Sequence, residues 1–112
     1  MSPTEIDLES LRESFDWIYK YINNVKGQLK SRINDRQTVF ALMISSYWAT
    51  VDLANLIGFY ADGDTSKANE IREKVEHVFK LLHKLHECDP SFFLASEAAT
   101  HKHKLLGILP CL

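Results

Sequence analysis

Residues 38–60, TVFALMISSYWATVDLANLIGFY, decide the fold, and Asp52 is the only charged residue among them. An ordinary surface helix has one apolar stripe and one polar face. In this stretch apolar side chains point in every direction around a helix. We expect such a helix to be covered all round, so it is the central member of a bundle, half of an interface with a second chain, or embedded in a membrane.

The membrane alternative is set by length and by the polar residues inside the stretch. The segment is long enough to span a bilayer. However, Asp52 and Asn55 lie within it, and a carboxylate near the centre of a spanning helix costs roughly 2.5–3.5 kcal/mol. The neighbouring segments are amphipathic and suited to burying it in water. We therefore expect no membrane insertion.

The segments on either side have helical periodicity. Before the central stretch, apolar residues recur at alternating spacings of three and four, which predicts a helix over 2–31 with one packing stripe. That stripe is formed by Leu8, Leu11, Phe15, Ile18, Ile22, Val25 and Leu29. After it, Asp62, Gly63 and Asp64 are typical of a turn, and Asp64 can cap the next helix.

A third helix is predicted over 65–88 and a fourth over 90–106. The stripe of the third consists of Ile71, Val75, Val78, Leu82 and Leu85. Pro90 suits the first position of the fourth helix, and Gly107 suits its C-cap. With the central helix at 35–61, we expect an all-α fold: a single domain over 1–112, built as an antiparallel four-helix bundle with an apolar central second helix.

Composition narrows the class of function. The chain has 112 residues, 13 Lys and Arg, 15 Asp and Glu, and a net charge of −2. Neither half is strongly basic, so nucleic acid is not an expected partner. Cys88 and Cys111 have no disulfide-scaffold or metal-ligand spacing, and the acidic N-terminus has no apolar signal region. We expect a cytoplasmic protein.

Arg72 and His77 have an R-x4-H spacing within the predicted third helix. This spacing resembles the catalytic motif of HEPN-domain ribonucleases, and the resemblance covers these two residues only. It implies a metal-independent ribonuclease whose Arg and His meet at a dimer interface. His77 would then handle the proton of the attacking 2′-hydroxyl, and Arg72 would steady the phosphate charge. Glu73 stands where such motifs often carry Asn, Asp or His. In the alternative, both side chains lie on the solvent-facing side of the helix.

A second candidate site is formed by His83, His86 and Glu87, which share one face of the same helix. Imidazole and carboxylate are ligands for transition metals. His101 and His103 are two residues apart and diverge by about 200° on a helix, so only one of them could join. The alternative is that these are surface histidines, and we expect no bound metal and no cofactor.

Two pairs of residues are candidates for a protein interface. Trp17 and Tyr21 are four residues apart and lie beside the main stripe of the first helix, where they can contact another helix or a partner. Trp48 and Asp52 lie on the least apolar face of the central helix. If buried, Asp52 must find a hydrogen bond or a cation, and it could fix the register of an interface.

The last residues of the chain, 108–112, are largely apolar. Leu109 and Leu112 are therefore expected to pack on the bundle or on a neighbouring subunit. Together with excess apolar helix surface and the absence of catalytic motifs from the sequence, this predicts a small non-catalytic interaction protein of the adaptor, immunity, antitoxin or phage-type inhibitor class. We expect a homodimer formed through the first or second helix, acting on a protein partner.

Overall fold

The computed structural model describes residues 8–28, 36–88 and 94–109. Throughout these residues, every regular element is a helix, so the predicted all-α class is confirmed. The elements are α1 (Leu8–Gln28), α2 (Arg36–Ala61), the single-turn 3-10 helix η1 (Thr65–Lys67), α3 (Ala68–Cys88) and α4 (Ala95–Leu106).

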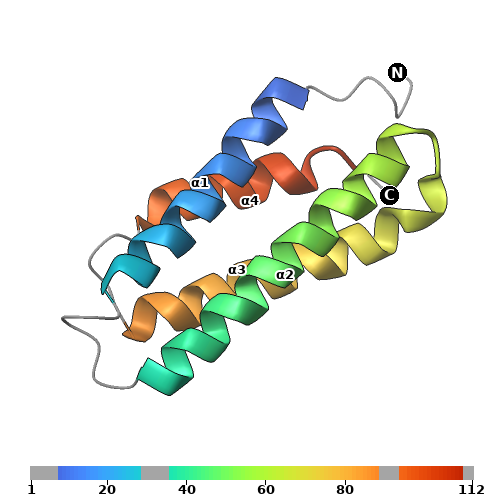
Figure 1. The fold of residues 1–112 in the computed structure, drawn as a ribbon. Coiled ribbons are helices and arrows are strands. Elements are labelled where there is room, and N and C mark those ends of the chain that lie inside the picture. The colour runs from blue at the N-terminus through green and yellow to red at the C-terminus, as the bar shows by residue number, and fades with distance from the viewer. Residues whose placement is uncertain (1–7, 29–35, 89–93, 110–112) are drawn as a thin grey trace.

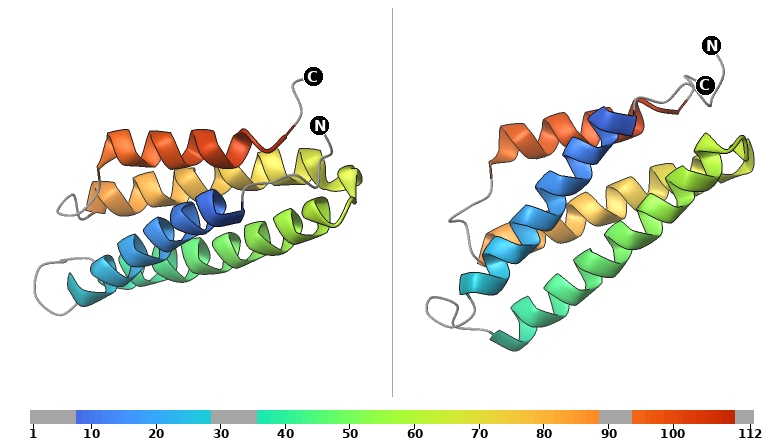
Figure 2. Two further views of the ribbon diagram at one scale, coloured as in Figure 1. Left: turned by 90° about the horizontal axis from the view of Figure 1, so that it is seen from above. Right: turned by 45° about the horizontal axis from the view of Figure 1, so that its top comes forward.

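Consecutive long helices run in opposite directions along an elongated molecule of 48 × 22 × 21 Å (Figure 1). The α2 helix packs most extensively against α3 and also against α1, while α4 packs against α1 and α3. The views in Figure 2 show α4 and α2 at opposite corners of this arrangement. Each long helix therefore has two main neighbours and one side that turns outward.

The helix ends follow local sequence rules. Residue 35 of the predicted second helix lies outside the described residues, and α2 ends at the predicted residue, Ala61. Gly63 then adopts φ +104°, a conformation that glycine reaches without steric cost. Asp64 accepts a hydrogen bond from the Ser66 backbone N–H at 3.2 Å, so the turn that was expected to open the third helix is the 3-10 turn η1.

The first and fourth helices can be compared with prediction only in part. Residues 2–7 and 29–31 of the predicted first helix, and 90–93 of the predicted fourth, lie outside the described residues. The α4 helix begins after Leu94, whose backbone is extended. Gly107 caps its C-terminus, as predicted, and donates its N–H to the His103 carbonyl at 2.9 Å.

The core lies between the four long helices. All five predicted stripe residues of α3 are buried with no measurable exposure, so that periodicity is confirmed. From α1, the predicted stripe supplies Leu11, Ile18, Ile22 and Val25 to the core, but Leu8 at its start is 65% exposed. Each fully buried aliphatic side chain contributes about 1.5–3 kcal/mol relative to an exposed one, so the α3 stripe is the main apolar support of the fold.

The expectation that α2 is a central, fully covered helix is wrong for the single chain. Its inner side is buried at Val39, Leu53 and Tyr60, but Phe40 and Trp48 on the other side are 55% and 58% exposed. The physical reason is the number of neighbours. With only α1, α3 and the short η1 packed against it, α2 keeps one long side that no element of the described chain covers.

Candidate interaction surface

The exposed side of α2 carries most of the exposed large apolar side chains of the described chain. We call it the outer face of α2, and its large members are Phe40, Ile44, Tyr47, Trp48 and Phe59. These side chains are 43–58% exposed. At about 150–250 Å² for a full aromatic side chain, they present on the order of 500 Å² of apolar surface. A patch of that size is at the upper end for a monomer and often marks an interaction site.

Aromatic contacts extend the outer face toward α1. The rings of Tyr47 and Trp48 meet edge to face, with centroids 5.3 Å apart. Tyr19 of α1 lies against Tyr47 at a centroid distance of 5.8 Å. Burial, and secondarily the neighbouring Tyr47 hydroxyl, raise the pKa of Tyr19 above its ordinary value. A partner on the outer face would therefore meet a connected group of three aromatic rings.

Asp52 marks the edge of the outer face on the α3 side. Its carboxylate lies 3.7 Å from the Lys74 ammonium, and its side chain is 60% exposed. Because solvent reaches the carboxylate, Asp52 does not need a hydrogen bond or a cation to offset the burial of its charge. An exposed pair of this kind contributes about 0–1 kcal/mol, so Asp52 belongs to a polar rim.

Trp17 and Tyr21, the other predicted aromatic pair, pack within the chain. Tyr21 is 3% exposed, and its ring stacks on Trp17 with centroids 6.1 Å apart. The half-buried Trp17 donates its indole N–H to the Glu97 carboxylate of α4 at 2.7 Å and stacks on His101 at 5.1 Å. These residues hold α1 against α4, and Tyr21 is not part of the accessible surface of the single chain.

Leu109 and Leu112 are the two residues of the C-terminal segment that were predicted to pack on the bundle or on a neighbouring subunit. Leu109 is 8% exposed and belongs to the core, so it packs on its own chain. Leu112 lies outside the described residues. The apolar character of Leu109 is therefore explained by packing within the chain.

Sequence reasoning missed one polar contact between α1 and α4. The fully buried Ser14 lies with its hydroxyl 2.8 Å from Nδ1 of His101. Burial, and then the Lys104 ammonium, lower the pKa of His101, while the carboxylates of Glu97 and Glu13 oppose this shift. Ser14 occurs among apolar stripe residues of α1, but nothing in the sequence pairs it with a histidine so far along the chain.

Arg72 and His77 do not converge within the single chain. They are five residues apart on α3, which places them about 140° apart around the helix. The Arg72 guanidinium donates to the side-chain oxygen of Asn69 at 3.0 Å. His77 is exposed and lines two shallow pockets, one on each side of it. Arg72 lines neither pocket.

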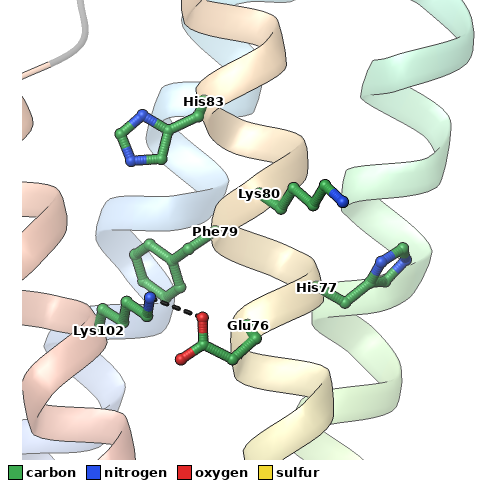
Figure 3. Close-up of a pocket in the computed structure, with 6 residues that line it drawn as sticks. All are labelled: Glu76, His77, Phe79, Lys80, His83 and Lys102. Carbon is green, nitrogen blue, oxygen red and sulfur yellow. Dashed lines mark ion pairs between the residues drawn. The ribbon is translucent and has the colours of Figure 1, made fainter.

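One of these pockets, of about 320 Å³, lies between α3 and α4. Figure 3 shows Glu76 reaching Lys102 across it, with 2.7 Å between the ammonium and the carboxylate, while His83 points to the α4 side and His77 to the other. Phe79 forms its apolar floor. The cation of Lys102 is thus paired within the chain, and the two histidines do not point at a common ligand.

The predicted metal ligands also remain separate. His83 and Glu87 are exposed and His86 is half-buried. Among residues 8–28, 36–88 and 94–109, no three His, Cys, Asp or Glu side chains are placed to hold a metal ion. The arrangement of the described residues therefore gives no support to a metal centre.

By length and composition, α2 is also the one described helix that could cross a membrane. About a third of its most apolar window is buried within the fold. The core helix of a soluble protein passes the same test, so this finding does not choose between a protein partner and a bilayer.

Comparisons of the chain with protein-family models, with curated proteins and with solved structures find no match. The functional conclusion therefore depends on the geometry of this chain alone, and the outer face of α2 is its most pronounced unexplained feature.

Proposed function

We propose that this chain is a small, non-catalytic helical interaction protein of the adaptor, immunity, antitoxin or phage-type inhibitor class. It acts by binding other protein chains, and the outer face of α2 is the surface through which a chain binds it. We further propose that it is built as an antiparallel four-helix bundle, works as a cytoplasmic protein and forms a homodimer. The observation that carries the proposal is the exposed row of aromatic and aliphatic side chains on α2.

Solvation physics favours a partner on this face. Apolar surface left in water forgoes about 25 cal/mol for each Å² that could be buried. The outer face has no charged residue between Gln37 and Val51, so covering that stretch desolvates no ion. Large aromatic side chains surrounded by a polar rim are the usual anchors of protein interfaces. Trp48 is the best placed of them, because it is more than half exposed and already contacts Tyr47.

Neither the ribonuclease alternative nor the metal alternative is supported by a surface feature comparable with the outer face of α2. Asp52, which pairs with Lys74 of α3, lies about 120° around α2 from Phe40. His77 lines a pocket with Lys74 and with Leu56 of α2, so it lies beyond the Asp52 rim of the outer face, and Arg72 does not line that pocket. A dimer formed through the outer face therefore gives no support to a composite catalytic site of Arg72 and His77.

Tryptophan fluorescence tests the proposal directly, because Trp17 and Trp48 are the two tryptophans of the chain. In a Trp17→Phe variant, all indole emission comes from Trp48 on the outer face. We expect its emission maximum to shift to shorter wavelength, and its quenching by acrylamide to fall, as the protein concentration rises. In the matched Trp48→Phe variant, emission from the half-buried Trp17 should not change. A Trp48 that remains solvent-exposed at every concentration would remove the homodimer from the proposal.

A further inference from the structure

A regular seam runs along the outer face of α2. Its members follow alternating spacings of four and three, which is the spacing that lets two helices interlock along their length. We call it the α2 seam, and it consists of Phe40, Ile44, Tyr47, Val51, Ala54 and Gly58. Each of these residues is exposed or half-exposed in the single chain.

The seam has a gradient of side-chain size. Its first half carries the large residues Phe40, Ile44 and Tyr47, and its second half carries Val51, Ala54 and Gly58. The two halves are symmetric in position about residue 49. A second α2 helix running antiparallel would therefore set each large residue against a small one. The facing pairs would be Phe40 with Gly58, Ile44 with Ala54, and Tyr47 with Val51.

A parallel second helix would do the opposite. It would set Phe40 on Phe40 and Gly58 on Gly58, leaving a crowded end and an open end. Because protein interfaces are packed as closely as protein interiors, voids and clashes along one seam are both costly. The size gradient therefore favours the antiparallel arrangement.

Charge at the helix ends agrees with the same symmetry. Arg36 begins α2 and Asp62 follows its end, and both are exposed. These two positions are also symmetric about residue 49, so an antiparallel copy would bring Arg36 of one chain to Asp62 of the other at both ends. Antiparallel helices also place opposite ends of their dipoles side by side.

The surface area is of the right order for a dimer. The outer face supplies on the order of 500 Å² of apolar surface, and a stable interface needs about 800 Å² from each partner. Trp48 flanks the seam next to the symmetry axis, and Tyr19 borders it from α1. Trp48 is already counted in the outer face, so the further area comes from Tyr19 and from the seam residues Val51, Ala54 and Gly58.

From the size gradient, the end charges and the area, we infer that a second copy of this chain docks antiparallel on the α2 seam, about a two-fold axis at the level of residue 49. This inference rests on the proposed function, and it specifies the partner and the register of the interface.

The first test replaces Gly58, whose small size matters in the inferred dimer but not in the single chain. A Cβ added to Gly58 meets no atom within 4 Å in the single chain, so Gly58→Leu should leave the monomer folded and its helix content unchanged. In the antiparallel dimer the new side chain meets Phe40 of the other copy at two symmetric positions. We expect the dimer Kd to rise at least tenfold. A parallel dimer would instead be tightened, because leucine would fill its open end.

Gly27 provides the matched control. It is an exposed helical glycine of α1, and a Cβ added there also meets nothing within 4 Å. Gly27→Leu should therefore change helix propensity in the same direction without changing the dimer Kd. An equal effect of the two substitutions would show that the Gly58 result does not come from the seam.

The second test is disulfide trapping in a background with Cys88→Ser and Cys111→Ser. Chains carrying Phe40→Cys are mixed with differently tagged chains carrying Gly58→Cys and oxidised. The inference predicts a cross-link in the mixture and none within either chain type alone, because the two copies of residue 40 would lie about 27 Å apart along the helices. Ile44→Cys with Ala54→Cys is a second facing pair that guards against local disruption by either substitution.

The outcomes separate failure of the inference from failure of the proposed function. A dimer that forms only self-cross-links, or none at either pair, overturns the antiparallel arrangement. A dimer whose mass is unaffected by Trp48→Ala uses another surface and overturns the proposed role of the outer face. A monomer whose Trp48 emission shifts only on addition of phosphatidylcholine vesicles overturns the second copy as the occupant, in favour of a membrane.

Discussion

Replacing Trp48 with alanine should separate dimerisation from folding. Trp48 is 58% exposed in the single chain. With roughly 250 Å² for a complete tryptophan side chain, it offers about 145 Å² to a partner. At about 25 cal/mol per Å², full coverage would contribute about 3.5 kcal/mol for each protomer. A homodimer loses this contribution twice, so about 7 kcal/mol is an upper estimate for one substitution.

The measurable change will be smaller, because area does not convert fully into affinity. We expect Trp48→Ala to weaken the dimer at least a hundredfold in Kd, which corresponds to about 2.7 kcal/mol. The assay is light scattering after size-exclusion chromatography over a dilution series. Circular dichroism of the dilute protein should show unchanged helix content, since substitution of an exposed residue usually alters folding stability by about 0.5 kcal/mol or less.

Leu94→Ala is the matched control for this experiment. Leu94 is 55% exposed, but it precedes α4, whose main neighbours are α1 and α3. Its substitution removes exposed apolar surface away from the outer face of α2, so the dimer Kd should not change. A dimer that is equally stable with Trp48→Ala and with Leu94→Ala would refute the reasoning from exposed area.

Three further predictions concern the fold. Leu53→Ala, at a core position of α2 with no measurable exposure, should lower the free energy of unfolding by about 2–5 kcal/mol in urea titrations; a loss below 1 kcal/mol would contradict its place in the core. Folding lowers the pKa of His101 below its ordinary value of 6.5, so its neutral form is favoured in the native state and stability should fall as the pH drops through 6.5 toward the lower native value. Unfolding measured from pH 7.5 to 5 should show a shallower loss for His101→Gln than for the wild type, and identical slopes would count against this role. Lys74→Met keeps the aliphatic stem of a side chain that is 30% exposed and removes the ion pair with Asp52. It should cost less than about 1 kcal/mol by thermal denaturation, whereas a larger cost would mean that the pair is structural.

The fold class could be predicted because apolar periodicity records burial directly. The α3 stripe recurs at helical spacing, and all five of its residues are buried. The turn at Gly63 follows from the positive φ that glycine reaches without steric cost. The end of α4 at Gly107 follows from the enrichment of glycine just past helix ends, although Gly107 itself has φ −67°. These signals are local, so no knowledge of the tertiary arrangement is needed.

The exposure of one side of α2 could not be predicted from the sequence. Its composition indicates that all sides should be covered, but composition does not say whether the cover comes from the same chain or from another molecule. Trp48 and Tyr21 illustrate the difficulty. Both are aromatic residues beside a helical stripe, yet one is 58% exposed and the other is 3% exposed. Only the packing of α4 on α1, through contacts such as Trp17 with Glu97, separates the two cases.

The central claim is that the outer face of α2 is covered by another copy of the chain, and the solution mass of the wild-type protein tests it most directly. Light scattering over a wide range of concentrations should give about twice the chain mass of 12.9 kDa, with dissociation only on strong dilution. A mass equal to a single chain at every concentration would contradict the account.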